Sequence, residues 1–206
     1  MLAIKYGASA LGLVSEMPSG PGVIDDEVIN EIASKVPPPV ATFLLTSKQN
    51  AEEIIAQHSK TKTNALQLVD HLPHNELTKL REQLPGIKLI QVIHVLDEQS
   101  IEEALSVKKY IDALLLDSGN PKLKVKELGG TGRTHNWEIS RSIVERVNLP
   151  VFLAGGLNSE NVKEAIEIVQ PYGLDICSGV RTNNQLDEEK LRLFFEIVNK
   201  FNCGIA

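Results

Sequence analysis

The sequence predicts a (β/α)8 barrel, because of the rhythm of the chain and the position of its special turns. Short apolar runs alternate with segments whose apolar residues recur at three- and four-residue spacing, which is typical of a parallel sheet covered by helices. Glycine-rich turns follow the last predicted strands, where barrels of this class build a phosphate site. An open dinucleotide-binding sheet would carry its glycines in the first turn, but prolines in the stretch 15–22 oppose a helix start there.

Strands are predicted from the apolar runs that are rich in aliphatic or β-branched residues. Seven such runs precede the last long helix, whereas a closed barrel needs eight strands. The chain opens in a helical pattern at 1–6 with no strand before it, so the first strand is expected to be missing at the N-terminus. The predicted strands are 10–14, 40–46, 65–69, 88–95, 113–117, 151–154 and 174–177.

Amphipathic helices are predicted between these strands, each with one apolar face for packing. No proline- or glycine-rich linker interrupts the pattern, so residues 1–206 are expected to form a single domain. The predicted helices are 26–36, 50–57, 76–84, 100–107, 138–147, 160–169 and 187–198.

The composition excludes several classes of protein. The net charge is −6, whereas a general nucleic-acid surface needs a basic excess to neutralise phosphates. No apolar run is long enough to span a membrane, and no basic start precedes an apolar leader. Two cysteines are too few for a disulfide framework, and the five histidines show no metal-ligand spacing with them. We therefore expect a cytoplasmic protein that binds no metal, nucleic acid or membrane.

Residues 129–134, GGTGRT, look at first like a nucleotide-binding loop. A phosphate loop needs a glycine five residues before its second glycine, and then a lysine followed by Ser or Thr. Here the first glycine position holds Glu127 and the lysine position holds Arg133. The charged stretch 122–127 also stands where an apolar strand should lead into the loop. The nucleotide-loop interpretation therefore fails.

Groups able to carry chemistry gather at the ends of the last three predicted strands. Asp117 ends an apolar strand, and a barrel would place its partly desolvated carboxyl group at the mouth. Gly155 and Gly156 free the backbone to approach an anion just before a helix, and Ser178 and Gly179 offer further backbone donors. Each feature alone also fits a tight turn or a helix cap. Together they predict a phosphate cradle beside an acid–base group.

Four segments of the chain carry a resemblance to a known family. They read LLLDS (114–118), GGTGRTHNW (129–137), FLAGGLNSENV (152–162) and PYGLDICSGV (171–180). In order and spacing they resemble phosphoribosylanthranilate isomerase, a (β/α)8 barrel enzyme of tryptophan biosynthesis. The match is close from 113 to about 195 and looser before. It implies that the loop containing Gly130 and Gly132 is a mobile lid over the substrate, with glycines as hinges.

The resemblance implies an Amadori rearrangement, an aldose–ketose isomerisation in which a phosphoribosyl amine opens and becomes a 1-amino-1-deoxyketose phosphate. It implies that Asp117 is the general acid and that Asp175 points into the pocket. It implies no cofactor, and the expected partner is a small phosphorylated sugar bound by a monomer or a homodimer. The phosphate would lie on the backbone of two loops, at Gly155, Gly156, Ser178 and Gly179.

Three positions depart from the family pattern and keep other functions open. An arginine used near the anthranilate carboxylate falls at Pro21, a histidine is replaced by Val69, and a glutamate is replaced by Arg181. We expect the phosphate-binding residues to be intact, whereas recognition of the anthranilate ring of the family substrate is expected to be altered. The alternatives are therefore an isomerase or lyase of another sugar phosphate, and a non-catalytic phosphosugar-binding protein.

The general base of the family is a cysteine in a first strand of the type Lys-Ile-Cys-Gly-Ile, and this chain begins after that strand. Its last residues, 200–206, resemble that strand at the opposite end of the chain. A strand at 200–204 would close the barrel and bring Cys203 to the mouth as the general base. The alternative is a tail with a chance Cys-Gly-Ile, on a chain that lacks its first strand and its base.

Overall fold

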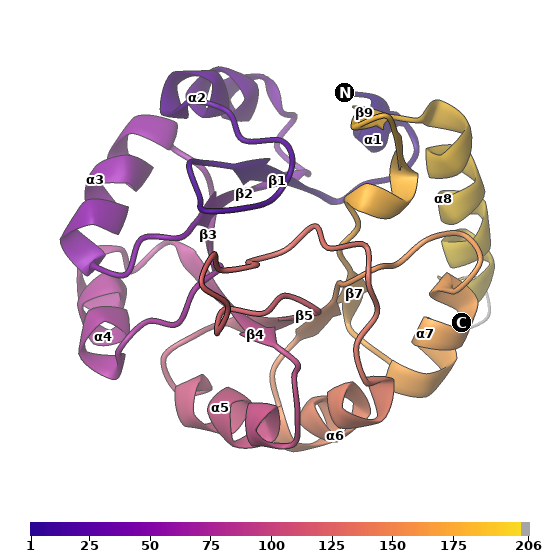
Figure 1. Ribbon diagram of the computed structural model, residues 1–206. Coiled ribbons are helices and arrows are strands. Elements are labelled where there is room, and N and C mark those ends of the chain that lie inside the picture. Colours follow the sequence, from indigo (N-terminus) through magenta and orange to yellow (C-terminus); the bar gives the residue numbers. More distant parts are fainter. Residues whose placement is uncertain (203–206) are drawn as a thin grey trace.

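The computed structural model describes residues 1–202, which form a curled sheet of seven parallel strands wrapped by helices (Figure 1). The strands are hydrogen-bonded in chain order, and a helix lies between each strand and the next. This arrangement confirms the predicted barrel architecture. The strands are β1 (Ala10–Val14), β2 (Ala41–Thr46), β3 (Ala65–Leu68), β4 (Lys88–His94), β5 (Ala113–Asp117), β6 (Val151–Leu153) and β7 (Gly173–Leu174).

The helices lie outside the strands and pack against the outward face of the sheet. A 3-10 turn, η1 (Ser178–Val180), and a small antiparallel pair, β8 (Arg181–Thr182) and β9 (Gln185–Leu186), connect β7 to the last helix. No helix in the described part of the chain is long and apolar enough to cross a bilayer. The helices are α1 (Leu2–Lys5), α2 (Asp26–Lys35), α3 (Ala51–Thr61), α4 (His74–Gln83), α5 (Gln99–Val107), α6 (Trp137–Val147), α7 (Val162–Val169) and α8 (Glu188–Asn202).

The predicted closing strand at the C-terminus is wrong for the residues that the structure describes. Residues 200–202 continue α8, because the apolar spacing that buries Leu191 and Phe194 runs on through Val198. Within residues 1–202, β1 and β7 are the two edges of the sheet and no strand is hydrogen-bonded between them. Cys203 lies outside the described residues. The other strand predictions are confirmed, except that β7 ends at Leu174 instead of continuing to 177.

Alternation along the strands sorts the buried side chains into two layers. On β5, Leu114 and Leu116 face the helices, whereas Asp117 shares the inward face with the interior apolar residues. Leu128 reaches this interior from the loop between β5 and α6, so that loop is anchored over the barrel. The buried interior residues are Ala65, Val69, Ile90, Val92, Ala113, Leu115, Leu128 and Ala154.

Leu116→Ala is expected to lower the free energy of unfolding by about 2–5 kcal/mol, because a fully buried leucine leaves a cavity between β5 and the helices. The matched control is Leu193→Ala on α8, where the side chain is 38% exposed and the change should be about 0.5 kcal/mol or less. Urea denaturation followed by circular dichroism measures both variants. Equal losses would contradict the assigned core.

Candidate active site

Two carboxyl groups are held at the same end of the sheet by its hydrogen-bond ladder. The backbone N–H of Ala154, just after β6, donates to the carbonyl of Leu116 at 2.8 Å, and the N–H of Asp175 donates to the carbonyl of Leu153 at 2.8 Å. These bonds fix the ends of β5, β6 and β7 level with one another. Asp117 and Asp175 are therefore two strand spacings apart, about 10 Å between backbones. Only the methyl group of Ala154 stands between them on β6.

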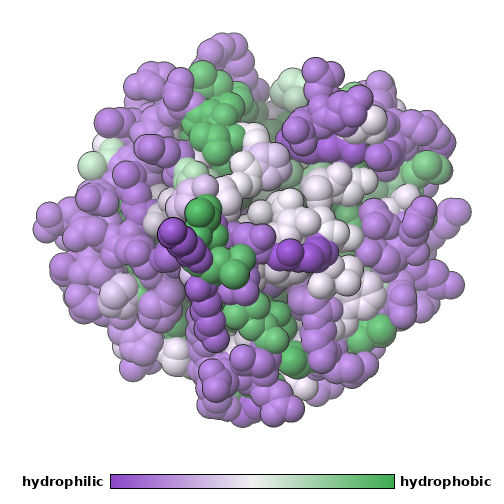
Figure 2. All heavy atoms as spheres, viewed as in Figure 1, coloured by the Kyte–Doolittle hydropathy of each residue, from purple (hydrophilic) through white to green (hydrophobic). Residues whose placement is uncertain are grey.

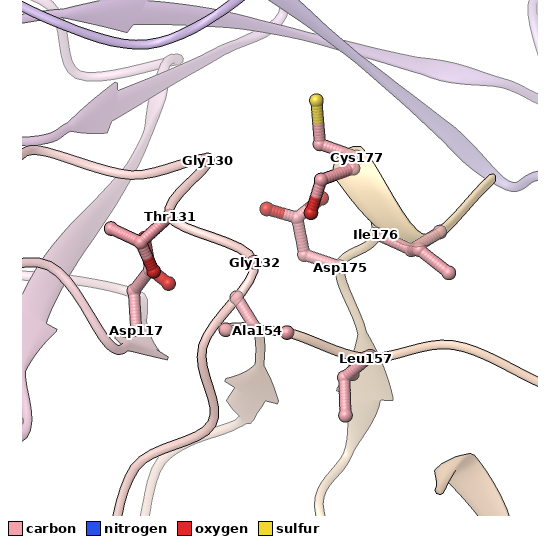
Figure 3. Close-up of a pocket in the computed structure, with 12 residues that line it drawn as sticks. Asp117, Gly130, Thr131, Gly132, Ala154, Leu157, Asp175, Ile176 and Cys177 are labelled. Atoms are coloured by element: carbon pink, nitrogen blue, oxygen red, sulfur yellow. The ribbon is translucent and has the colours of Figure 1, made fainter. Parts of the chain in front are cut away.

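A small cavity, partly open to solvent, lies at these strand ends. In Figure 3, Asp117 enters the cavity from β5, whereas Asp175 and Cys177 follow β7. The carboxyl group of Asp175 turns toward the loop at Gly130 and Gly132, and the sulfur of Cys177 points away from Asp117. The same face of the molecule shows residues of near-neutral hydropathy gathered inside a hydrophilic rim (Figure 2).

Asp117 is the more deeply buried of the two carboxyl groups, with 7% of the residue exposed. The backbone N–H of Ser118 donates to its Oδ1 at 2.7 Å. Burial raises the pKa of the Asp117 carboxyl, and the bond from Ser118 and the nearby His94 offset this only in part. A carboxyl group with these surroundings retains its proton to higher pH than an exposed aspartate.

Asp175 is partly buried beside Asp117. Burial, followed by the charge of Asp117, raises the pKa of the Asp175 carboxyl to about 6, against an opposing hydrogen bond from the backbone N–H of Ile176. Burial also raises the pKa of the Cys177 thiol, although Arg181 opposes this. At pH 7, Asp175 is therefore mainly ionised and Cys177 is protonated.

Two left-handed glycines bring the backbone of the β6–α7 turn against the β5–α6 loop. Gly155 and Gly156 have φ angles of +80° and +64°. A Cβ at Gly156 would lie 2.5 Å from the carbonyl carbon of Arg133, and one at Gly155 would lie 3.0 Å from Nδ1 of His135. The loop thus packs directly on this turn, which only glycine permits at that distance. The two glycines are therefore needed for this packing, and the phosphate cradle at the turn stays a prediction.

The loop between β5 and α6, residues 118–136, is tied down at several points and covers the cavity. Ser19 Oγ donates to the carbonyl of Lys126 at 2.6 Å, and the ammonium group of Lys126 pairs with the buried carboxylate of Asp70. A Cβ at Gly130 would lie 2.4 Å from Cδ of Pro21. Pro21, one of the positions that departs from the family pattern, therefore supports the loop sterically.

The structure brings together most of the residues predicted from the sequence. Gly179 lies behind the cavity wall, where a Cβ would be 1.9 Å from the carbonyl oxygen of Leu157. Cys177 and Thr131 also line the cavity but were not predicted, although alternation with Asp175 could have indicated Cys177. The predicted residues that line the cavity are Asp117, Gly130, Gly132, Gly155, Gly156, Asp175 and Ser178.

Asp175→Asn is expected to raise the free energy of unfolding at pH 7, by up to about 3 kcal/mol, because the raised pKa means that the fold disfavours the carboxylate. The folded carboxyl group binds its proton more tightly than the unfolded one. Its contribution to stability is therefore full below the ordinary pKa of 3.8 and is lost as the pH rises through about 6. The difference between variant and wild type should thus disappear near pH 4 and below. Denaturant titrations at a series of pH values measure it, and a variant less stable than wild type at pH 7 would contradict the assigned electrostatics.

Comparison with known proteins identifies the family of this chain. The family model described as N-(5'phosphoribosyl)anthranilate (PRA) isomerase matches residues 2–197. A relative of that name from Methanocella arvoryzae is 36% identical, over 94% of this chain and 88% of the relative. Another, from Microcystis aeruginosa, is also 36% identical, over 95% of this chain and 89% of the relative.

Solved structures of such enzymes share the fold. Phosphoribosyl anthranilate isomerase from Thermotoga maritima gives a TM-score of 0.82 at 28% identity, covering 97% of this chain and 92% of that one. A phosphoribosyl anthranilate isomerase in complex with reduced 1-(o-carboxyphenylamino)-1-deoxyribulose 5-phosphate gives 0.79 at 26% identity, covering 97% and 91%. The matched segment and the identities show that this chain belongs to the N-(5'-phosphoribosyl)anthranilate isomerase family.

Proposed function

We propose that this chain converts N-(5'-phosphoribosyl)anthranilate into 1-(o-carboxyphenylamino)-1-deoxyribulose 5-phosphate, an aldose–ketose isomerisation of tryptophan biosynthesis. The observation that carries the proposal is a single cavity, in a chain of this family, where the buried carboxyl group of Asp117 lies beside two glycine-rich turns. A carboxyl group that keeps its proton can act as an acid, and exposed backbone N–H groups can hold a phosphate. The reaction requires both.

The phosphate is proposed to bind at the turn after β6 and at the start of η1. Gly155 and Gly156 carry no side chain and have left-handed φ angles, which suits backbone donors that converge on an anion. Ser178, the first residue of η1, lines the same cavity. The close packing of Gly179 on Leu157 holds the two turns together. An anchor at this place orients the reacting carbons toward Asp117.

Asp117 is proposed to protonate the ring oxygen of the ribosyl group as the C1–O bond opens. The acid must be protonated before this step, and the burial that raises its pKa favours that state. The lid supports the geometry, because Ser118 Oγ and Thr131 Oγ1 are 2.8 Å apart and join the lid to the end of β5. Closing the lid also excludes water from the iminium intermediate.

A second candidate function, isomerisation or cleavage of another sugar phosphate, is favoured by one observation. Pro21 stands where the family arginine would contact the anthranilate carboxylate, and it packs against Gly130 instead. Loss of anthranilate fluorescence on addition of the wild-type protein separates the candidates. Turnover of phosphoribosylanthranilate supports the first function. Binding of a phosphosugar without that turnover supports the second function or a non-catalytic binder.

The assembly and location of the protein are also proposals. We propose a monomer or a homodimer, since the cavity is built from the strand ends of a single chain. We propose a cytoplasmic location, because a phosphorylated substrate does not cross a bilayer unaided. Sedimentation velocity measures the oligomeric state.

Gly156→Ala is expected to weaken binding of inorganic phosphate and of the reduced product analogue by about tenfold or more. The new Cβ meets the backbone of Arg133, and a left-handed φ costs a non-glycine residue about 1–3 kcal/mol, which displaces the turn. The control is Gly86→Ala, because a Cβ at Gly86 meets no atom within 4 Å. Isothermal titration calorimetry measures the affinity of both variants for phosphate and for the analogue. Equal affinities would exclude a phosphate site at this turn.

Asp117→Asn is expected to lower kcat by about 10²–10⁴, because the amide keeps the shape of the side chain but cannot donate a proton to the ring oxygen. Affinity for the product analogue should stay close to that of wild type. The control is Asp112→Asn, at the opposite end of β5, where the carboxylate pairs with Arg81 at 2.8 Å and accepts a bond from the N–H of Leu89 at 2.8 Å. That variant should lose stability but keep its turnover. An undiminished kcat in Asp117→Asn would exclude Asp117 from the mechanism.

A further inference from the structure

The proposed substrate carries two anionic groups, a phosphate at one end and a carboxylate on the aromatic ring at the other. The phosphate is proposed to bind at the turn after β6 and at the start of η1. The carboxylate also needs a partner, since removing an unpaired charge from water is costly. The identity of that partner rests on the proposed function, because the proposed substrate supplies the carboxylate.

Arg181 is the one arginine without a carboxylate partner in the described part of the chain. Its side chain is half-buried, and Nη1 donates to the backbone carbonyl of Asn184 at 2.8 Å. Since a guanidinium group carries five N–H donors and a permanent charge, it can bind an anion while it keeps this bond. The arginines that form ion pairs with an aspartate or a glutamate are Arg81, Arg133, Arg141, Arg146 and Arg192.

The guanidinium group of Arg181 lies at the rim of the cavity. It is close enough to Cys177, in the cavity wall, for its charge to oppose the rise in the pKa of that thiol. A Cβ at Gly22, in the loop after β1, would lie 3.7 Å from Nη2 of Arg181. The side chain therefore extends from the segment after β7 to the loop after β1.

A tight hairpin holds the backbone of Arg181 in place directly after η1. Arg181 pairs with Leu186 across β8 and β9, and Asn183 and Asn184 connect the two strands. Their φ angles are +50° and +62°, which are the left-handed values that such a short turn requires and that asparagine tolerates. The ammonium group of Lys190 also donates to the carbonyl of Arg181 at 3.0 Å. The hairpin thus fixes the origin of the side chain next to the proposed phosphate site.

We propose that Arg181 binds the carboxylate of the anthranilate half of the substrate and determines specificity for that half. A planar guanidinium group can donate two parallel hydrogen bonds to a carboxylate. Gly22 leaves space for the ligand, because it has no side chain beside Nη2. The next residue in that loop is Pro21, with which the family arginine aligns. The positive charge therefore comes from another segment of this chain and reaches the same loop.

The other cations around the mouth of the barrel fit this role less well. Arg133 in the lid is paired with Glu127, and Lys126 is paired with the buried Asp70. Lys48 follows β2 at the same edge of the sheet and forms no ion pair within residues 1–202. Lys48 is therefore the alternative that the test must exclude.

The test measures the affinity of two ligands by isothermal titration calorimetry. One is the reduced product analogue, and the other is the same molecule with hydrogen in place of the ring carboxyl group. Wild type should bind the first ligand about 10–100-fold more tightly, as expected for a charge-assisted pair. Arg181→Gln should lower the affinity for the first ligand by about that factor and leave the affinity for the second unchanged.

Two further variants make the comparison specific to the guanidinium group. Arg181→Lys should keep part of the preference for the carboxylate, because an ammonium group keeps the charge but lacks the planar fork. Lys48→Gln is the matched control, which removes a cation from the same edge of the sheet and should behave like wild type.

Equal affinity of wild type for the two ligands would overturn the inference. An equal loss for both ligands in Arg181→Gln would do the same, because it indicates a purely structural role for the hairpin. A selective loss in Lys48→Gln alone would assign the carboxylate to Lys48 instead.

Failure of the proposed function is distinguishable from failure of this inference, because the binding measurements do not require turnover. If wild type does not convert phosphoribosylanthranilate but keeps a preference that depends on Arg181, the proposed function fails and the carboxylate site stands. If wild type binds neither ligand, both fail.

Discussion

The site depends on one constraint, which is that two carboxyl groups line the same partly enclosed cavity. The parallel ladder fixes Asp117 and Asp175 at one edge of the sheet, and Ala154 between them is too small to separate them. Burial and mutual repulsion then disfavour ionisation of both at once. The fold therefore loses stability at neutral pH, where the carboxylate forms are disfavoured.

The β5–α6 loop and the β6–α7 turn are held together by close contacts between their backbones. Gly156 allows the chain at Arg133 to lie on the β6–α7 turn, and Gly130 allows Pro21 to lie on the lid from the other side. Leu128 fills the top of the barrel interior below them. The wall of the cavity on this side is therefore formed largely by main chain, as the proposed phosphate site requires.

The sequence predicted the strands, the inward face of Asp117 and the glycine turns, because these depend on local periodicity and on residue type. It predicted neither the end of β7 nor the position of Cys177 in the cavity wall. The apolar pattern continues to 177, but hydrogen bonding within the sheet stops at Leu174, and this depends on tertiary contacts that no local pattern shows. It predicted a strand at 200–204 from a short resemblance, but the helical spacing through Val198 extends α8 to 202. The contact of Pro21 with the lid joins distant segments, and no local pattern encodes it.

The coupling of the two carboxyl groups is tested most directly by carbon-13 NMR titration of the aspartate side chains in the folded protein, in wild type and in Asp117→Asn. The account predicts that Asp175 titrates near pH 6 in the wild type and at a lower pH once the charge of Asp117 is removed. Titration of both carboxyl groups near pH 4, with Asp175 unaffected by the substitution, would contradict it.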